Sequence, residues 1–306
     1  MKNILLGKTN VSVPAISVGC MRLNALDQTK ATDFINNAIE HGATHFDHAD
    51  IYGKGECEVM FGKAIKDLNI KRDEIFIQSK CGIVPGIMYD FSYEHITTSV
   101  DGILSRLGTD YLDMLLLHRP DALIEPEIVA KAFDNLYNCG KVKAFGVSNM
   151  KPMQIELIKK YSKFDIQANQ LQLSVTNSQM IRNGMEVNML TDGSIDRDGS
   201  VLDYCRLNDI TIQAWSPFQY GFFEGVFLDN DRFAHLNTVI NEIAQKHSVS
   251  NVAIASAWIL RHPANIQMIT GTTNKDRFNN ICEGANIILS REEWYKIYIA
   301  AGNMLP

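Results

Sequence analysis

Short apolar stretches alternate with stretches of helical periodicity along most of this chain, and that alternation limits the fold more than any other feature. Eight apolar stretches have the length and composition of buried strands, and helical patterns separate them. Such a repeat builds a parallel sheet, because each helix returns the chain to the edge where the next strand begins. The predicted strands cover residues 15–19, 44–46, 75–79, 111–117, 142–147, 166–170, 210–214 and 267–270.

The helical stretches carry their apolar residues on one face. In the stretch 93–107, for example, Ile96, Val100 and Ile103 recur at helical spacing, and Gly108 follows as a stop signal. The predicted helices cover residues 29–41, 56–68, 93–107, 126–138, 153–161, 201–207, 236–247, 252–261 and 291–301.

Eight strands favour closure into a (β/α)8 TIM barrel, in the α/β class, over an open doubly wound sheet. An open nucleotide-binding sheet would carry G-x-G-x-x-G after its first strand, and this sequence has none there. Apolar stretches around 7–10 predict an N-terminal β-hairpin, and 291–301 predicts a C-terminal extra helix. The polar segment 171–199 reads as an insertion over one face. We expect a single domain over 1–306.

Composition excludes several classes of partner. The net charge of -6 argues against a nucleic-acid-binding surface. No stretch approaches roughly 20 uninterrupted apolar residues, and the apolar run at the start is too short for a signal peptide, so we expect no membrane association. Six cysteines without a C-x-x-C pair suit free thiols in a reducing compartment. These features predict a cytoplasmic protein, and they leave its oligomeric state open.

Chemically versatile residues follow several predicted strands, where barrel enzymes carry their chemistry. Asp47 and Tyr52 follow the second strand, Lys80 the third and His118 the fourth. A carboxylate and a phenol suggest proton transfer if a nearby cation lowers the phenol's pKa from about 10. Singly, these residues are ordinary caps, surface groups or structural histidines. Their joint placement on one rim favours a functional site.

The motifs at these strand ends resemble those of the aldo-keto reductase superfamily, in family order. The matching segments are FDHADIYG at 46–53, Lys80, LHRPD at 117–121, GVSN at 146–149, WSP at 215–217, and GTTN at 271–274 with Arg277. The resemblance implies NADPH-dependent reduction of aldehydes and ketones to alcohols, with Asp47, Tyr52, Lys80 and His118 as a catalytic tetrad. A small carbonyl compound is the expected substrate.

The resemblance gives each member of the tetrad a role. Tyr52 is the expected proton donor, its pKa lowered by the Lys80 ammonium, because a positive charge favours phenolate. Asp47 fixes Lys80 by a charge-assisted hydrogen bond. His118 holds the carbonyl oxygen near the phenol. The nicotinamide supplies the hydride.

The resemblance also places the cofactor. Ser148, Asn149 and Gln170 are expected at the nicotinamide carboxamide, and Trp215 offers a ring face for stacking. The remaining expected contacts are Cys20 and Met21 after the first strand, Ser216, Pro217 and Phe218 in the loop that crosses the pyrophosphate, and Gly271, Thr272, Thr273, Arg277 and Asn280 around the adenosine half. Arg277 can contact a 2′-phosphate in bidentate fashion.

Three residues depart from the family pattern. His48 replaces the commoner Thr or Ser, and Trp215 stands where Tyr is more frequent. Thr273 occupies a place where many relatives carry a basic residue, so NADPH is the expected cofactor and NADH the alternative.

Two other functions remain as alternatives. One is an NADPH-binding regulatory or sensor subunit with little turnover. The other is a metal-dependent hydrolase using His48, Asp50, His118 and Asp121 as ligands. Such hydrolases usually show H-x-H at a strand end, which is missing here, and we therefore expect no metal.

Overall fold

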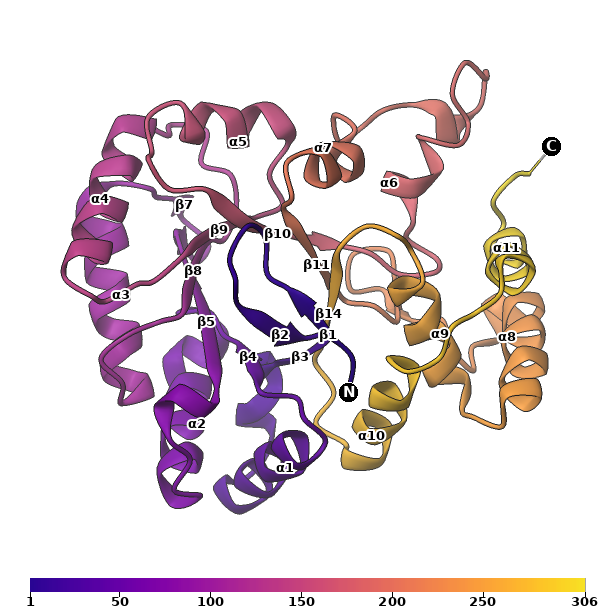
Figure 1. The fold of residues 1–306 in the computed structure, drawn as a ribbon, viewed down its shortest axis with the longest axis horizontal. Coiled ribbons are helices and arrows are strands. Elements are labelled where there is room, and N and C mark those ends of the chain that lie inside the picture. Colours follow the sequence, from indigo (N-terminus) through magenta and orange to yellow (C-terminus); the bar gives the residue numbers. More distant parts are fainter. Residues whose placement is uncertain (306) are drawn as a thin grey trace.

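The computed structural model describes residues 1–305, and a closed barrel of eight parallel strands lies at its centre (Figure 1). Its strands follow one another around the barrel in chain order, and β14 pairs with β3 to close it. They are β3 (Ile16–Gly19), β4 (His45–Asp47), β5 (Phe76–Cys81), β8 (Met114–Leu117), β9 (Phe145–Ser148), β10 (Ile166–Gln172), β11 (Thr211–Trp215) and β14 (Ile266–Thr270). The predicted TIM barrel is therefore confirmed.

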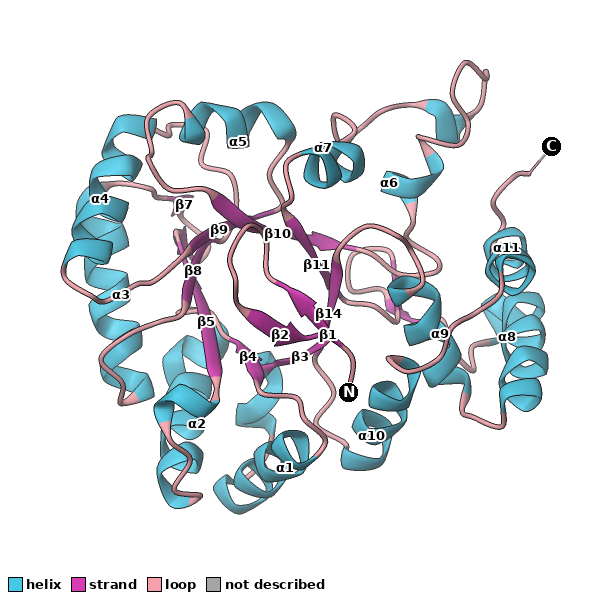
Figure 2. Ribbon diagram, viewed as in Figure 1, coloured by secondary structure: helices cyan, strands magenta, loops and turns pink. Residues whose placement is uncertain are grey.

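Helices surround the barrel, as the cyan ribbons of Figure 2 show. Amphipathic faces explain most of them, and α3 and α4 have the predicted bounds. The helices that follow barrel strands are α1 (Gln28–Glu40), α2 (Glu56–Asp67), α3 (Tyr93–Leu107), α4 (Pro126–Asn138), α5 (Pro152–Lys159), α7 (Val201–Leu207), α9 (Asn251–Leu260) and α10 (Lys275–Gly284).

Helix α10 is absent from the sequence-based prediction. Its sequence, KDRFNNICEG, is mostly polar, and its buried apolar side chains are only Phe278, Ile281 and Cys282. Tertiary packing against α9 forms this helix where periodicity gives a weak signal. The omission matters because α10 carries two of the expected cofactor contacts.

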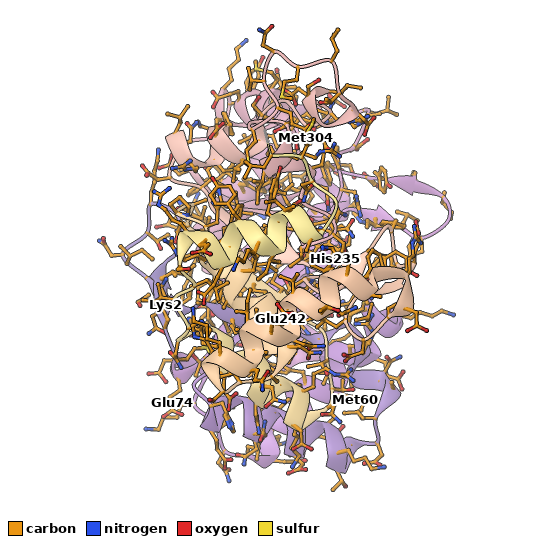
Figure 3. All side chains as sticks on the ribbon, turned by 90° about the vertical axis from the view of Figure 1, so that its right-hand side faces the viewer. Lys2, Met60, Glu74, His235, Glu242 and Met304 are labelled. Carbon is orange, nitrogen blue, oxygen red and sulfur yellow. The ribbon has the colours of Figure 1, made fainter. Side chains whose placement is uncertain are left out.

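Two further helices, α8 (Ala234–His247) and α11 (Arg291–Ala300), lie outside the strand–helix alternation and cover α9. Figure 3 views the molecule from their side, with His235 and Glu242 of α8 in front. Trp258 of α9 stacks on Trp294 of α11 at 4.8 Å, and each indole donates to the other residue's carbonyl. The predicted C-terminal extra helix, α11, is thus confirmed.

The predicted N-terminal hairpin is also confirmed, and it fills the end of the barrel opposite the carboxyl ends of the strands. It consists of β1 (Asn3–Leu5) and β2 (Ser12–Pro14), paired antiparallel. Leu6 and Val13 pack with residues of β8 and β10 inside the barrel, and both are buried. The hairpin therefore covers this end of the barrel, and the carboxyl ends of the strands lie at the other end.

The segment predicted as an insertion begins two residues later than expected, because Leu171 and Gln172 still belong to β10. It contains α6 (Gln179–Arg182). The end of β10 and the start of this segment support the loop after β11: Gln172 Nε2 of β10 donates to the Gly221 carbonyl at 2.6 Å, and Ser174 Oγ donates to the Gln219 carbonyl at 2.7 Å. That loop holds the short strands β12 (Gln219–Tyr220) and β13 (Gly225–Val226), and a similar hairpin, β6 (Ile83–Val84) with β7 (Met88–Tyr89), follows β5.

None of the helices within residues 1–305 has the length and apolar character needed to cross a bilayer.

Candidate active site

The four expected catalytic residues lie together at the carboxyl ends of three neighbouring strands. Asp47 is the last residue of β4, Lys80 lies near the end of β5, and His118 directly follows β8. These ends adjoin because β5 pairs with both β4 and β8. Tyr52 comes from the turn after β4. One side of the barrel mouth thus collects a carboxylate, an ammonium group, an imidazole and a phenol.

Tyr52 reaches β5 because the backbone after it turns sharply. Gly53, Lys54 and Gly55 have φ angles of 57°, 57° and 92°. Glycine adopts such left-handed conformations at little cost, which suits the sequence Tyr-Gly-Lys-Gly. The turn leaves the Tyr52 hydroxyl 3.2 Å from Lys80 Nζ.

Lys80 is fully buried, and its ammonium group uses all three of its donors. Nζ donates to Asp47 Oδ2 at 2.8 Å, to the His48 carbonyl at 2.8 Å and to Tyr52 Oη at 3.2 Å. Burial alone lowers the pKa of Lys80, but Asp47 and Tyr52 outweigh it and raise the pKa above its ordinary value. Lys80 therefore remains a cation beside the phenol.

The prediction that Lys80 lowers the pKa of Tyr52 is wrong in its net direction. Burial raises the pKa of the phenol, and the attraction of Lys80 for the phenolate offsets only part of that rise, while Asp47 adds to it. Tyr52 therefore keeps its proton at neutral pH. A protonated phenol is the form that can donate a proton.

His118 is a neutral imidazole in this environment. Burial lowers its pKa well below the ordinary value, and the charges of Lys80 and Arg119 lower it further. Its ring lies 6.0 Å from that of Tyr52 between centroids, at 82°, and its buried Nδ1 has no hydrogen-bond partner among residues 1–305. His118 can thus orient an oxygen near Tyr52 by hydrogen bonding, without adding charge.

Four buried glutamines support Asp47 from inside the barrel, and we call them the glutamine ladder: Gln78, Gln170, Gln213 and Gln267. Asp47 Oδ1 accepts from the side-chain amides of Gln78 and Gln170. Gln213 bonds to Gln78 and Gln267, at 2.8 Å each, and to Gln170. The ladder therefore holds the carboxylate oxygen that does not bind Lys80.

Sequence reasoning missed three of these glutamines. The available signal was a glutamine directly after an isoleucine in each of the strands β5, β11 and β14. Gln170 was predicted, but for the nicotinamide carboxamide. Its Nε2 donates to Asp47 at 2.9 Å and to Gln213 at 3.3 Å, which leaves its side-chain oxygen, Oε1, for a ligand.

The other residues expected at the nicotinamide adjoin one another at the ends of β9, β10 and β11. Asn149 Nδ2 donates to Ser148 Oγ at 2.7 Å, and Ser148 Oγ donates to the backbone carbonyl of Gln170 at 3.1 Å. Trp215 Nε1 donates to Asn149 Oδ1 at 3.1 Å. The structure thus brings an amide, a hydroxyl and an indole face together beside the tetrad.

The residues expected around the adenosine half gather at β14 and α10. Gly271, Thr272 and Thr273 form the connection, and Arg277 and Asn280, three positions apart on α10, share a helix face. The exposed Arg277 side chain forms no ion pair with the described residues 1–305.

The connection after β14 also meets the first strand's loop. Arg22, in the 3₁₀ turn after β3, donates through Nη1 to the Gly271 carbonyl at 3.2 Å. Arg22 thus contacts this connection, and Arg277 lies in the first turn of the helix that follows it. Two basic side chains near one loop suit a phosphate-bearing ligand.

The remaining expected contacts lie in the first and seventh strand loops. Cys20 is fully buried in the core, where burial raises the pKa of its thiol well above the ordinary value, and Met21 is partly exposed. Ser216, Pro217 and Phe218 lead from β11 into the β12–β13 loop. The tip of that loop covers Trp215, whose ring stacks on Phe223 at 5.8 Å.

Two acidic side chains, the buried Glu58 and the partly buried Asp50, lie close to each other near the site. Glu58 accepts from Ser79 Oγ at 2.8 Å and pairs with Arg106 at 2.7 Å. Asp50 lies nearby with a buried Oδ1 that has no partner among residues 1–305. Burial first, and Glu58 second, raise the pKa of Asp50 to about 7, although Arg106 and Lys80 lower it.

This raised pKa predicts that the folded protein loses stability as pH rises. Because Asp50 takes up its proton more readily when folded, its ionisation destabilises the fold as pH rises from about 4 to about 7. We expect Asp50→Asn to exceed the wild type in unfolding free energy by roughly 2 kcal/mol at pH 8 and to lose that advantage near pH 4. Urea unfolding at both pH values measures this, and a pH-independent difference would contradict the assignment.

The metal-dependent hydrolase gains no support from this geometry. The His48 ring is buried against Phe61, 4.5 Å between centroids, and neither of its nitrogens has a partner in the described chain. Asp121 accepts from the backbone N–H groups of Phe91 and Leu123. Across residues 1–305, no three His, Cys, Asp or Glu side chains are grouped as metal ligands.

Comparisons with known proteins identify the relatives of this chain. The model of the Aldo/keto reductase family matches residues 15–301. The uncharacterized oxidoreductase YcsN of Bacillus subtilis is 34% identical over 295 residues, covering 92% of each chain. The 6-dehydroglucose reductase of Agrobacterium fabrum is 33% identical over 278 residues, covering 87% of this chain and 86% of that protein.

A solved structure extends the agreement to three dimensions. The thermostable aldo-keto reductase Tm1743, in complex with the inhibitor epalrestat, superimposes with a TM-score of 0.79 at 26% sequence identity. The match covers 98% of this chain and 100% of that one.

Proposed function

Because this chain belongs to the aldo/keto reductase family, we propose that it reduces aldehydes or ketones to alcohols with NADPH, using Tyr52 as the proton donor. Family membership makes it a nicotinamide-dependent oxidoreductase that acts on carbonyl groups. The observation that carries the finer proposal is the chain of contacts from Asp47 through Lys80 to the Tyr52 hydroxyl, 2.8 Å and 3.2 Å long.

The proposed proton transfer follows from these contacts. When bound, NADPH supplies the hydride for the carbonyl carbon. Tyr52 gives its hydroxyl proton to the carbonyl oxygen, so that its own O–H bond breaks as the alcohol O–H bond forms. The phenolate left behind accepts a hydrogen bond from the Lys80 ammonium, which stabilises its charge. Asp47 keeps Lys80 positive, and neutral His118 orients the oxygen.

The donor set at the mouth supports a nicotinamide nucleotide as the cofactor. Ser148, Asn149 and the side-chain oxygen of Gln170 would hold the carboxamide, and Trp215 would face the ring. Arg277 and the first turn of α10 would hold the adenosine phosphate, because a helix N-terminus and a guanidinium both favour an anion.

We expect Arg277→Ala to weaken NADPH binding by about ten- to a hundredfold, the value of a charge-assisted contact to phosphate. NADH, which lacks the 2′-phosphate, should be affected much less. Fluorescence titration with each cofactor measures the two dissociation constants. Arg291→Ala, at an exposed position at the start of α11, is the matched control. Equal weakening of both cofactors would remove the 2′-phosphate role.

Turnover separates the reductase from the sensor alternative. The purified protein is titrated with NADPH and with NADH, and the absorbance of the bound cofactor is followed after adding 4-nitrobenzaldehyde. Tight binding with oxidation supports the reductase. Tight binding without oxidation of several aldehydes would favour a sensor, and binding of neither cofactor would contradict both.

A further inference from the structure

Arg119, which directly follows His118, reaches across the mouth of the barrel. It stands at the end of β8, yet its Cζ lies 5.8 Å from the ring centroid of Trp215, at the end of β11, and 5.9 Å from that of Phe222. Because β9 and β10 separate β8 from β11, the side chain spans the opening. Its charge also acts on His118 and Tyr52. Arg119 therefore borders the space where a substrate would meet the phenol.

The Arg119 guanidinium has no anionic partner. It forms no ion pair and donates no hydrogen bond to any of residues 1–305. Asp121, the acid nearest in sequence, accepts from the backbone N–H groups of Phe91 and Leu123 instead. The two aromatic rings attract the cation but offer no oxygen acceptor. All five of its N–H donors thus lack an acceptor within the described chain.

A partly buried cation without an anion loses hydration and gains little in return. Trp215 and Phe222 recover part of this loss, because each ring attracts the charge. An acidic ligand would recover more, since the planar guanidinium matches a carboxylate with two parallel hydrogen bonds. The side chain is therefore arranged to receive an anionic group from outside the protein.

We propose that Arg119 binds an acidic group of the substrate, so that the enzyme prefers carbonyl compounds that also carry a carboxylate. This inference rests on the proposed reductase function and adds a substrate class to it. Tyr52 would act on the carbonyl, while Arg119, which lies over the rings of Trp215 and Phe222, would hold the acid. Arg119 is in this sense a specificity-determining residue.

The test compares two aldehydes that differ in charge, 4-carboxybenzaldehyde and its neutral counterpart 4-formylbenzamide. We expect the wild type to prefer the carboxylate by about tenfold or more in kcat/KM, and Arg119→Gln to reduce that preference by about ten- to a hundredfold. Arg119→Lys should retain part of it, because a point charge remains but the planar fork is lost. The preference should also fall as salt is added.

Arg232→Gln is the matched control. It removes an exposed arginine that packs on Tyr220, a residue of the loop after β11 that also carries Phe222. We expect it to keep the wild-type ratio of the two aldehydes. An unchanged ratio in Arg119→Gln, or a wild type that treats the two aldehydes alike, would overturn the inference while leaving the reductase function intact.

A binding measurement tests Arg119 without turnover. Calorimetric titration with benzoate and with benzamide should show at least about tenfold tighter binding of benzoate by the wild type, and equal binding by Arg119→Gln. Equal binding of the two compounds by the wild type would overturn the carboxylate site. If neither aldehyde is reduced while benzoate binds through Arg119, the reductase proposal fails and the anion site stands.

Discussion

Replacing Tyr52 with Phe is expected to lower kcat for aldehyde reduction by about 10²- to 10⁴-fold, the range that a positioned proton donor contributes. The ring would remain, and only the hydroxyl that bonds to Lys80 would be lost. Without this hydroxyl, Tyr52 could no longer donate a proton to the substrate oxygen as negative charge develops on it. Single-turnover stopped-flow absorbance of NADPH measures the step directly.

Measuring NADPH binding distinguishes loss of the proton donor from loss of the cofactor. NADPH should bind Tyr52→Phe about as tightly as the wild type, because the hydrogen bond that the hydroxyl makes within residues 1–305 is to Lys80. Tyr111→Phe is the control. It removes only the hydroxyl of a tyrosine whose ring packs beneath Arg72, just before β8 begins at the far end of the barrel. This variant should keep a rate near that of the wild type. Reduction by Tyr52→Phe at the wild-type rate would sink the assignment of the proton donor.

Replacing Lys80 with Met should cost both activity and stability. The phenolate that remains after proton transfer would lose its counter-charge, and a preorganised contact of this kind is worth about 10²- to 10³-fold in kcat. Asp47 would also be left buried without its cation, and losing one partner of a buried pair costs about 3–5 kcal/mol. Steady-state kinetics and urea unfolding measure the two effects.

A second variant separates these two consequences. Combining Lys80→Met with Asp47→Asn removes the stranded charge, so the unfolding free energy should recover relative to Lys80→Met alone. Activity should not recover, since the cation beside Tyr52 is still missing. If the double variant regained turnover, Lys80 would have a structural role only.

Most of the fold follows from periodicity in the sequence. The eight strands and the N-terminal hairpin have apolar patterns that burial in a barrel requires, and α3 and α4 carry clear apolar faces. Helix α10 does not, because its packing on α9 comes from few apolar residues. Its existence depends on tertiary contacts that no local pattern records.

The candidate site was less predictable than the fold. Asp47, Tyr52, Lys80 and His118 could be proposed because they follow predicted strands and match the motifs of a known family. Gln78, Gln213 and Gln267 could not, since a glutamine within a predicted strand does not by itself show that its side chain points into the barrel. The sign of the Tyr52 pKa shift depends on whether burial or Lys80 has the larger effect, and burial becomes measurable only in three dimensions. The roles of the tetrad remain predictions that the variants above test.

The glutamine ladder also bears on the order in which the chain can assemble. Its last member, Gln267, donates to the carbonyl of Pro14 at 2.8 Å, a contact between residues 253 positions apart. Bonds of such long range form late, because a large loop must close before they contribute. A chain still lacking β14 would leave Gln213 without one of its amide partners, although Asp47 and Lys80 had long been synthesised. The support beneath the Asp47 carboxylate is therefore complete only when the final strand closes the barrel.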